Sequence, residues 1–211
     1  MTDDLFTDAI TDIDELRELY PEPAGQGRAK EIDTVDDMAR RLIALAPLVF
    51  VASADADGRC DVSPRGGPPG FVSVLGDGTV VVPDATGNRR IDTFRNVVVT
   101  GRVGLVFVIP GRGQTLRVNG AACVSRRPEL LASLTAVGKA PRAALVVRPD
   151  EVFTHCPKAF VRSALWDPAS WPDATAQPTP AEVVHTHLRD PGISLADVER
   201  DMVDSLRDRL A

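Results

Sequence analysis

The amino-acid sequence predicts a mostly β protein of the α+β class, an antiparallel barrel with peripheral helices. Short apolar runs rich in β-branched residues follow one another through the middle of the chain, with Gly and Asp turn residues between them. These runs are joined mainly by hairpins, and a single helical pattern interrupts them near the centre. A parallel sheet would need a crossover helix after almost every strand, so this order favours an antiparallel sheet.

The apolar runs predict six to eight strands in chain order. They lie at 48–54, 60–63, 71–75, 79–83, 103–109, 115–125, 143–147 and 152–155. The run at 103–109 is almost continuously apolar, which is typical of a strand buried on both faces. Residues 64–70 are rich in proline, which donates no ladder hydrogen bond, and are not expected to form a regular central strand.

Helical spacing of apolar residues predicts helices around the barrel, at 10–20, 34–46, 89–98, 128–134, 158–165 and 194–210. The last is amphipathic, and Ser194 with Asp197 has the spacing of a capping box. Residues 172–182 contain three prolines and are expected to be a linker. The predicted organisation is therefore a helix and loop at 1–33, a barrel domain at 34–171, and a linker with a helix at 172–211.

Composition limits the kinds of partner. The net charge of −6 gives no general reason to bind nucleic acid or an anionic membrane. The three cysteines form no Cys-x-x-Cys pair, and the acidic N-terminus lacks a signal-peptide pattern, so we expect a cytoplasmic protein. His185 and His187 have a spacing seen in metal sites, but no further ligands complete a site, and no metal is expected.

The segment 83–96 is the most informative for function. It follows an apolar strand, passes through a Thr-Gly-Asn turn and continues with helical spacing, so Asn88 is a candidate N-cap. Arg89 and Arg90 would then lie on the first helical turn, where the helix dipole already makes the potential positive. A bound phosphate would compensate these charges. The alternative is a pair of solvated arginines on a surface helix.

Three further segments place polar side chains beside predicted strands. Each alone is compatible with an ordinary surface, but together with Arg89 and Arg90 they put four arginines and a lysine on a barrel of negative net charge. This combination favours a small anionic ligand. The residues are Ser63 and Arg65, Thr115 and Arg117, and His155 and Lys158.

These motifs resemble the pyridoxamine 5′-phosphate oxidase-related FMN-binding proteins, in a bacterial branch of that superfamily rather than the oxidase itself. The similarity covers roughly residues 34–171 and rests on Ser-Pro-Arg-Gly, Gly-Asn-Arg-Arg, Thr-Leu-Arg-Val-Asn-Gly, His-Cys-Pro-Lys-Ala and Leu-Trp-Asp-Pro. The resemblance implies a split β-barrel, a homodimer, and one FMN per subunit in a groove at the dimer interface. The Arg-x-His pattern with which the oxidase binds its substrate is not evident, so pyridoxamine phosphate is not expected as the substrate.

The resemblance also assigns roles by position. Asn88, Arg89 and Arg90 match the segment that binds the flavin phosphate. Ser63 and Arg65 match the strand beside the ring and the ribityl chain. Thr115 and Arg117 match the strand that faces the cofactor, while the segment from Lys158 to Trp166 matches the part that closes the site, from either subunit.

The function that follows is an FMN-dependent oxidoreductase moving a hydride between a small organic molecule and the flavin. No residue stands out as a general acid or base, so no catalytic residue is assigned. Two alternatives use the same fold. One is a non-catalytic flavin- or haem-binding protein, for which His155 would be the candidate axial ligand; the other is a deazaflavin-dependent reductase.

Overall fold

The computed structural model describes residues 6–22, 25, 29–85, 87 and 89–209. Contacts divide the chain into two units, residues 1–31 and residues 32–211. In the first unit, helix α1 (Ile13–Leu19) is capped by the carboxylate of Asp12, which accepts a hydrogen bond from the Asp14 N–H at 2.7 Å. The separation of residues 172–211 from the barrel stays a prediction.

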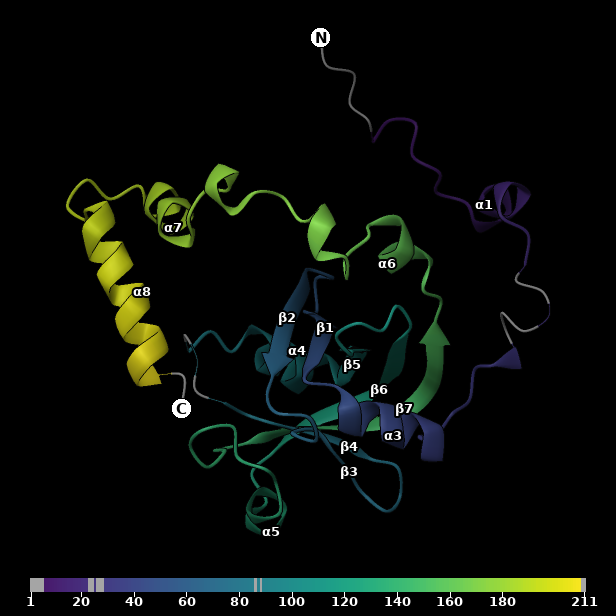
Figure 1. The fold of residues 1–211 in the computed structure, drawn as a ribbon. Helices are drawn as coiled ribbons and strands as arrows, with labels where there is room; N and C mark the ends of the chain where they lie inside the picture. Colours follow the sequence, from purple (N-terminus) through teal and green to yellow (C-terminus); the bar gives the residue numbers. More distant parts are fainter. Residues whose placement is uncertain (1–5, 23–24, 26–28, 86, 88, 210–211) are drawn as a thin grey trace. The chain divides into compact units, whose positions relative to one another are not determined.

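Seven strands form one antiparallel sheet in the order β2-β1-β5-β6-β7-β4-β3 (Figure 1). The end strands β2 and β3 each pair with a single neighbour. This arrangement confirms the mostly β, antiparallel split barrel. The strands are β1 (Leu48–Ala54), β2 (Cys60–Gly66), β3 (Ser73–Val74), β4 (Val80–Pro83), β5 (Arg102–Val108), β6 (Thr115–Ser125) and β7 (Ala144–His155).

Helices α3 and α4 pack against the sheet. Helix α3 contacts β3 and β6, and α4 contacts β1, β2, β5 and β6, whereas α7 and α8 pack against each other. No helix within the described part of the chain has the length and apolar character needed to span a bilayer. The helices of this unit are α3 (Asp37–Leu45), α4 (Asp92–Thr100), α5 (Pro128–Ala132), α6 (Lys158–Arg162), α7 (Pro180–Leu188) and α8 (Leu195–Arg209), with 3₁₀ turns at Pro168–Ser170 and Ala174–Ala176.

The sheet has one buried face and one more open face. Residues directly opposite each other in an antiparallel pair share a face, and alternate residues of a strand share it too. The inner face carries the core row Val51, Leu105, Val118 and Val152, which are at most 1% exposed. The outer face is marked by the neighbouring row Phe50, Val106, Arg117 and Phe153, which are exposed or half-buried.

Strand β5 differs from the expectation of burial on both faces. Val103, Leu105 and Phe107 are buried on the inner face, whereas on the outer face Val108 is buried but Gly104 and Val106 are only half-buried. The strand is therefore buried on both faces only at its end, and Val106 keeps part of its apolar surface exposed on the outer face.

Strand β2 also corrects the prediction. It continues through Pro64 and Arg65 to Gly66, beyond the expected end at Ser63. Proline is tolerated because β2 is an edge strand, where a missing N–H need not break a ladder on both sides. This extension places Arg65 within a strand rather than in a loop.

The two short strands predicted at 143–147 and 152–155 are one strand, β7. Its pairing with β6 shifts between Asn119 and Gly120, so that Asn119 pairs with Glu151 and Gly120 with Pro149. Asp150 is the extra residue of a β-bulge. The bulge accommodates Pro149 and lets the strand continue where the sequence suggested a break.

Helix α7 was not predicted, because its proline and threonine start resembled a linker. It opens with a capping box in which the Thr179 Oγ accepts from the Glu182 N–H and the Glu182 carboxylate accepts from the Thr179 N–H. Pro180 occupies the first turn, where its missing N–H costs nothing. The expected linker at 172–182 therefore ends in the first turn of a helix.

The capping box of α8 is confirmed and gives a pH-dependent prediction. Ser194 N–H donates to the Asp197 carboxylate at 3.1 Å, and Asp197 N–H donates to the Ser194 Oγ at 3.2 Å. The hydrogen bond from the Ser194 side chain, and after it the one from the Ser194 backbone N–H, hold the pKa of Asp197 below its usual range. A lowered carboxyl pKa stabilises the helix start above the unfolded pKa, about 3.9, and this contribution is lost as pH falls through the folded-state value. An NMR titration should show the Asp197 pKa rising in Ser194→Ala; an unchanged pKa would contradict the cap.

Candidate functional site

A row of polar side chains lies along the edge strand β2. Asp61, Ser63 and Arg65 alternate in sequence and pair with Ser53, Val51 and Val49 of β1 respectively. These β1 residues belong to the inner face and are 8%, 0% and 0% exposed. Asp61, Ser63 and Arg65 are half-buried, so they form a polar rim at the edge of the core.

Helix α4 contacts this rim on the inner face. The Asn96 side-chain amide donates to the Ser53 Oγ of β1 at 3.0 Å, and both residues are buried. Thr93, which is 2% exposed, lies one turn earlier and faces β2. The helix thus brings its first turn to the polar residues of β2.

A chain of hydrogen bonds joins the strand to the helix. Arg65 Nη2 donates to the Thr93 Oγ1 at 3.3 Å, and that hydroxyl donates to the Asp61 Oδ2 at 2.7 Å. Ser63 Oγ also donates to the Asp61 carboxylate, at 3.2 Å. Arg65 Nη1 donates to the Pro64 carbonyl at 2.9 Å. Sequence reasoning identified Ser63 and Arg65 but missed Asp61 and Thr93; the alternation of Asp61, Ser63 and Arg65 was the available signal for Asp61.

Arg90 is held by an ion pair at the start of α4. Its Nε lies 2.8 Å from the Asp92 Oδ2. The hydrogen bond and charge of Asp92, followed by the more distant charge of Asp61, raise the pKa of the Arg90 guanidinium above its usual range. Arg90 is therefore held as a cation by the Asp92 carboxylate, within the influence of the Asp61 charge.

The helix start differs from the prediction. Helix α4 begins at Asp92 after the N-cap Ile91, so Arg89 and Arg90 precede the helix instead of occupying its first turn. Asp92 is the acidic first-turn residue that the dipole favours, and Ile91 provides no side-chain hydrogen bond to the free N–H groups. Asn88, the predicted N-cap and phosphate ligand, lies outside the described residues.

Arg89 has an unusual backbone conformation. Its φ of +63° is in the left-handed region, which residues other than glycine seldom adopt. The residue is exposed, and no ion pair or hydrogen bond of its side chain is found within residues 6–22, 25, 29–85, 87 and 89–209. Such strained residues are often found at binding sites.

The structure does not bring Arg117 next to Arg65 within one chain. Arg117 belongs to the outer face, where its guanidinium lies 5.0 Å from the centre of the Phe153 ring. Arg65 belongs to the inner face through its pairing with Val49. Thr115, two residues before Arg117 on the same strand, is 6% exposed and pairs with His155.

Lys158 and Trp166 lie near the turn between β5 and β6. Trp166 Nε1 donates to the Arg112 carbonyl of that turn at 3.0 Å, and its ring stacks on Phe160 at 5.7 Å. Lys158 is exposed at the first position of α6. Trp166 therefore has an anchoring contact that sequence reasoning did not assign, and Lys158 is available to solvent.

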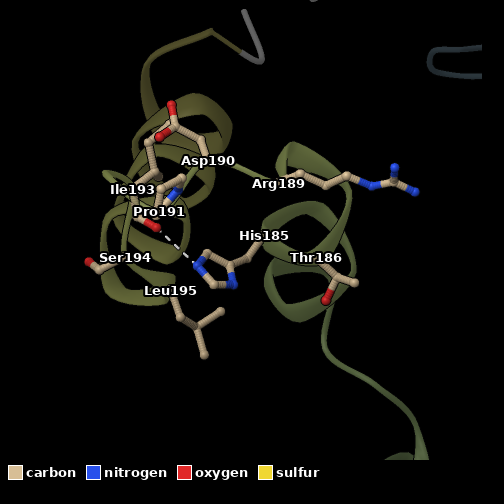
Figure 2. A pocket seen from close by; sticks show the side chains of 8 residues that line it. All are labelled: His185, Thr186, Arg189, Asp190, Pro191, Ile193, Ser194 and Leu195. Carbon is tan, nitrogen blue, oxygen red and sulfur yellow. Dashed lines mark hydrogen bonds between the residues drawn. The ribbon is translucent and has the colours of Figure 1, made fainter.

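A separate hollow of about 720 Å³ lies in the hairpin of α7 and α8 (Figure 2). His185 lies in it, with its Nε2 2.9 Å from the Ile193 carbonyl oxygen. The described part of the chain contains no group of three His, Cys, Asp or Glu side chains suited to a metal ion. His185 is thus held by a local contact, and the arginine cluster at β2 and α4 is the candidate site.

Comparison with known proteins identifies the family. A family model described as pyridoxamine 5′-phosphate oxidase matches residues 35–156. No curated protein matches the chain.

Similar solved structures include an F420 reductase (20% identity, 54% of this chain, 94% of that chain, TM-score 0.39). Another is HutZ, the heme storage protein from Vibrio cholerae (14% identity, 58% and 94% covered, TM-score 0.39). A third is a pyridoxamine 5′-phosphate oxidase-related, FMN binding protein from Nostoc punctiforme (14% identity, 52% and 74% covered, TM-score 0.39). Because the family model covers more than half of the sequence, the chain belongs to the pyridoxamine 5′-phosphate oxidase family.

Proposed function

We propose that the protein is an FMN-dependent oxidoreductase that moves a hydride between a small organic molecule and FMN bound at a homodimer interface. The observation that carries the proposal is the arginine cluster at the start of α4. Arg89 and Arg90 directly precede the helix, and Arg65 reaches its first turn through Thr93. The first-turn N–H groups have no side-chain cap from Ile91, so a phosphate would find both cations and free donors there.

The residues of the cluster fit a phosphate group. A phosphate dianion needs cations and N–H donors, and a chain of net charge −6 can supply them only locally. The two carboxylates of the cluster are already engaged, Asp61 by Thr93 and Ser63, and Asp92 by Arg90. Their repulsion toward a further anion is therefore reduced, and they hold the cations in place.

FMN, when bound, would supply the two-electron chemistry of its flavin ring. The chain would hold the phosphate with Arg89 and Arg90 and keep the Arg65 cation beside the ring and ribityl chain. A cation near the ring favours the anionic reduced flavin. Ser63 and Asp61 would keep that part of β2 rigid. The reaction proposed is direct hydride transfer, in which these residues bind and orient.

The outer face of the sheet supports the proposal of a homodimer. Phe50 is 37% exposed and Val62 is 63% exposed, beside the half-buried Val106 and Phe153. Apolar surface of this kind is favourable to cover with a protein partner. A second copy seated there would also explain Arg117, because a residue on the outer face of one subunit can reach a site on the other. We propose that the cofactor meets Arg65 of one subunit and Arg117 of the other.

Replacing Phe50 with glutamate should separate the dimer. Burying a carboxylate in an apolar interface is costly, so the protein should sediment near its monomer mass of 22.6 kDa. Because FMN is proposed to bind at the dimer interface, its affinity should fall when the dimer is lost. Met38→Glu, an exposed apolar position on α3, is the matched control and should change neither property. A Phe50→Glu protein that stays dimeric would exclude the outer face as the interface.

The function is tested first by the visible spectrum of the purified protein and by chromatography of the chromophore released on heating. We expect a flavin double band and a released compound that behaves as FMN. Anaerobic reduction of the bound flavin by a small organic donor, such as a reduced nicotinamide, would establish hydride transfer. A colourless protein that does not bind added FMN would contradict the proposal. A deazaflavin spectrum would identify the cofactor as F420 instead of FMN, and a Soret band would identify it as haem.

We also propose a cytoplasmic location. Cys60, Cys123 and Cys156 are unpaired and exposed. Free thiols persist in a reducing compartment and tend to oxidise outside one. Localisation of a tagged full-length chain would test this.

A further inference from the structure

We propose that Asp61 is a positioning residue that orients Arg65 toward the bound flavin nucleotide through the hydroxyl of Thr93. This inference rests on the proposed function and adds to it the residues that set the direction of the Arg65 guanidinium. Neither Asp61 nor Thr93 was singled out by the sequence motifs. The hydrogen bonds between β2 and α4 carry the argument.

The Thr93 hydroxyl determines the direction of the interaction. A hydroxyl has a single proton to donate. The Thr93 hydroxyl donates this proton to the Asp61 Oδ2, with an oxygen–oxygen distance of 2.7 Å. The lone pairs of the Thr93 oxygen then face Arg65, whose Nη2 donates to it at 3.3 Å. Without the carboxylate, the hydroxyl proton would lose its acceptor and the hydroxyl could rotate, so that its lone pairs would no longer be fixed toward the guanidinium. Asp61 thus keeps Thr93 an acceptor for Arg65.

The position of Thr93 makes this contact rigid. The residue is 2% exposed and lies in the first turn of α4, and a β-branched side chain has few rotamers in a helix. Asp61 is itself fixed by the Ser63 Oγ, which donates to its carboxylate at 3.2 Å. The acceptor that meets Arg65 is therefore held from both the strand and the helix.

Arg65 is anchored at both terminal nitrogens. Nη1 donates to the Pro64 carbonyl at 2.9 Å, and Nη2 donates to Thr93. These bonds define the plane of the guanidinium and leave its remaining N–H groups for a ligand. A pre-oriented guanidinium loses less side-chain entropy on binding than a free one.

A purely electrostatic role for Asp61 predicts the opposite result. As an anion near Arg65 and Arg90, it would repel the flavin phosphate, and removing its charge would tighten binding. As a positioning residue, it acts through an acceptor oxygen, and asparagine can supply that oxygen. The variants Asp61→Ala and Asp61→Asn therefore separate the two roles.

The experiment measures the dissociation constant of the full-length variants for FMN by quenching of flavin fluorescence. We expect Asp61→Ala to weaken binding about tenfold, the effect of losing a hydrogen bond linked to a charged group. Asp61→Asn should stay close to the wild type. Thr93→Val, which keeps the side-chain volume, should resemble Asp61→Ala, and Thr93→Ser should bind well. The Thr93 pair decides the question if Asp61→Ala does not fold.

A double-mutant cycle with Arg65→Ala completes the test. The loss caused by Asp61→Ala should disappear when Arg65 is absent. An equal loss in both backgrounds, or tighter binding by both Asp61 variants, would overturn the positioning role alone. A wild-type protein that does not bind FMN would overturn the proposed function, and this inference with it.

Discussion

Arg89→Ala is expected to weaken FMN binding by about 1.5–3 kcal/mol, the usual contribution of a hydrogen bond to a charged group. The reason is the position of Arg89, directly before the uncapped start of α4 and with a backbone φ of +63°. Arg90 is already paired with Asp92, so Arg89 is the cation with its donors free among the described residues. Fluorescence titration with FMN measures the effect.

The comparison with riboflavin locates the effect on the phosphate. Riboflavin lacks the phosphate, so its affinity should be the same for the wild type and Arg89→Ala. Arg95→Ala is the matched control, because it also removes one positive charge near the start of α4. Arg95 is exposed, and its Nη1 lies 4.0 Å from the Asp92 Oδ1. An Arg89→Ala protein that loses FMN and riboflavin affinity equally, or not at all, would disprove a phosphate site there.

Gly120→Ala is expected to destabilise the barrel by about 3 kcal/mol or more, the upper range of overpacking substitutions. A Cβ at Gly120 would lie 2.1 Å from the Arg148 carbonyl oxygen and 3.0 Å from the Pro149 Cα. These atoms are backbone and cannot move without opening the pairing of β6 with β7 at the bulge. Denaturant unfolding followed by circular dichroism measures the loss.

Gly76→Ala is the control for this prediction. A Cβ there has no neighbouring atom within 4 Å, and the residue does not have a positive φ. Its effect on the free energy of unfolding should stay within about 0.5 kcal/mol. A Gly120→Ala protein as stable as Gly76→Ala would show that the two strands do not approach so closely at the bulge.

The sequence was sufficient for the parts of the fold that depend on local patterns. The apolar, β-branched run at 48–54 and the alternation at 115–125 located β1 and β6 at their observed bounds, and the Ser194 and Asp197 spacing located the cap of α8. The predictions were wrong where a proline suggested the end of a strand and the fold accommodated that proline within the strand. Pro64 was compatible with a strand because β2 is at an edge, and a bulge let β7 pass Pro149.

The sequence by itself determined the class of the protein and the presence of cations suited to an anion, because both follow from composition and short-range spacing. Only the tertiary structure decided which of those cations lie together. The pairing register put Arg65 and Arg117 on opposite faces of the sheet, and the packing of α4 brought Thr93 to Asp61, 32 residues earlier in the chain. Such contacts depend on strand register and helix docking, which join residues that have no local relation in the sequence.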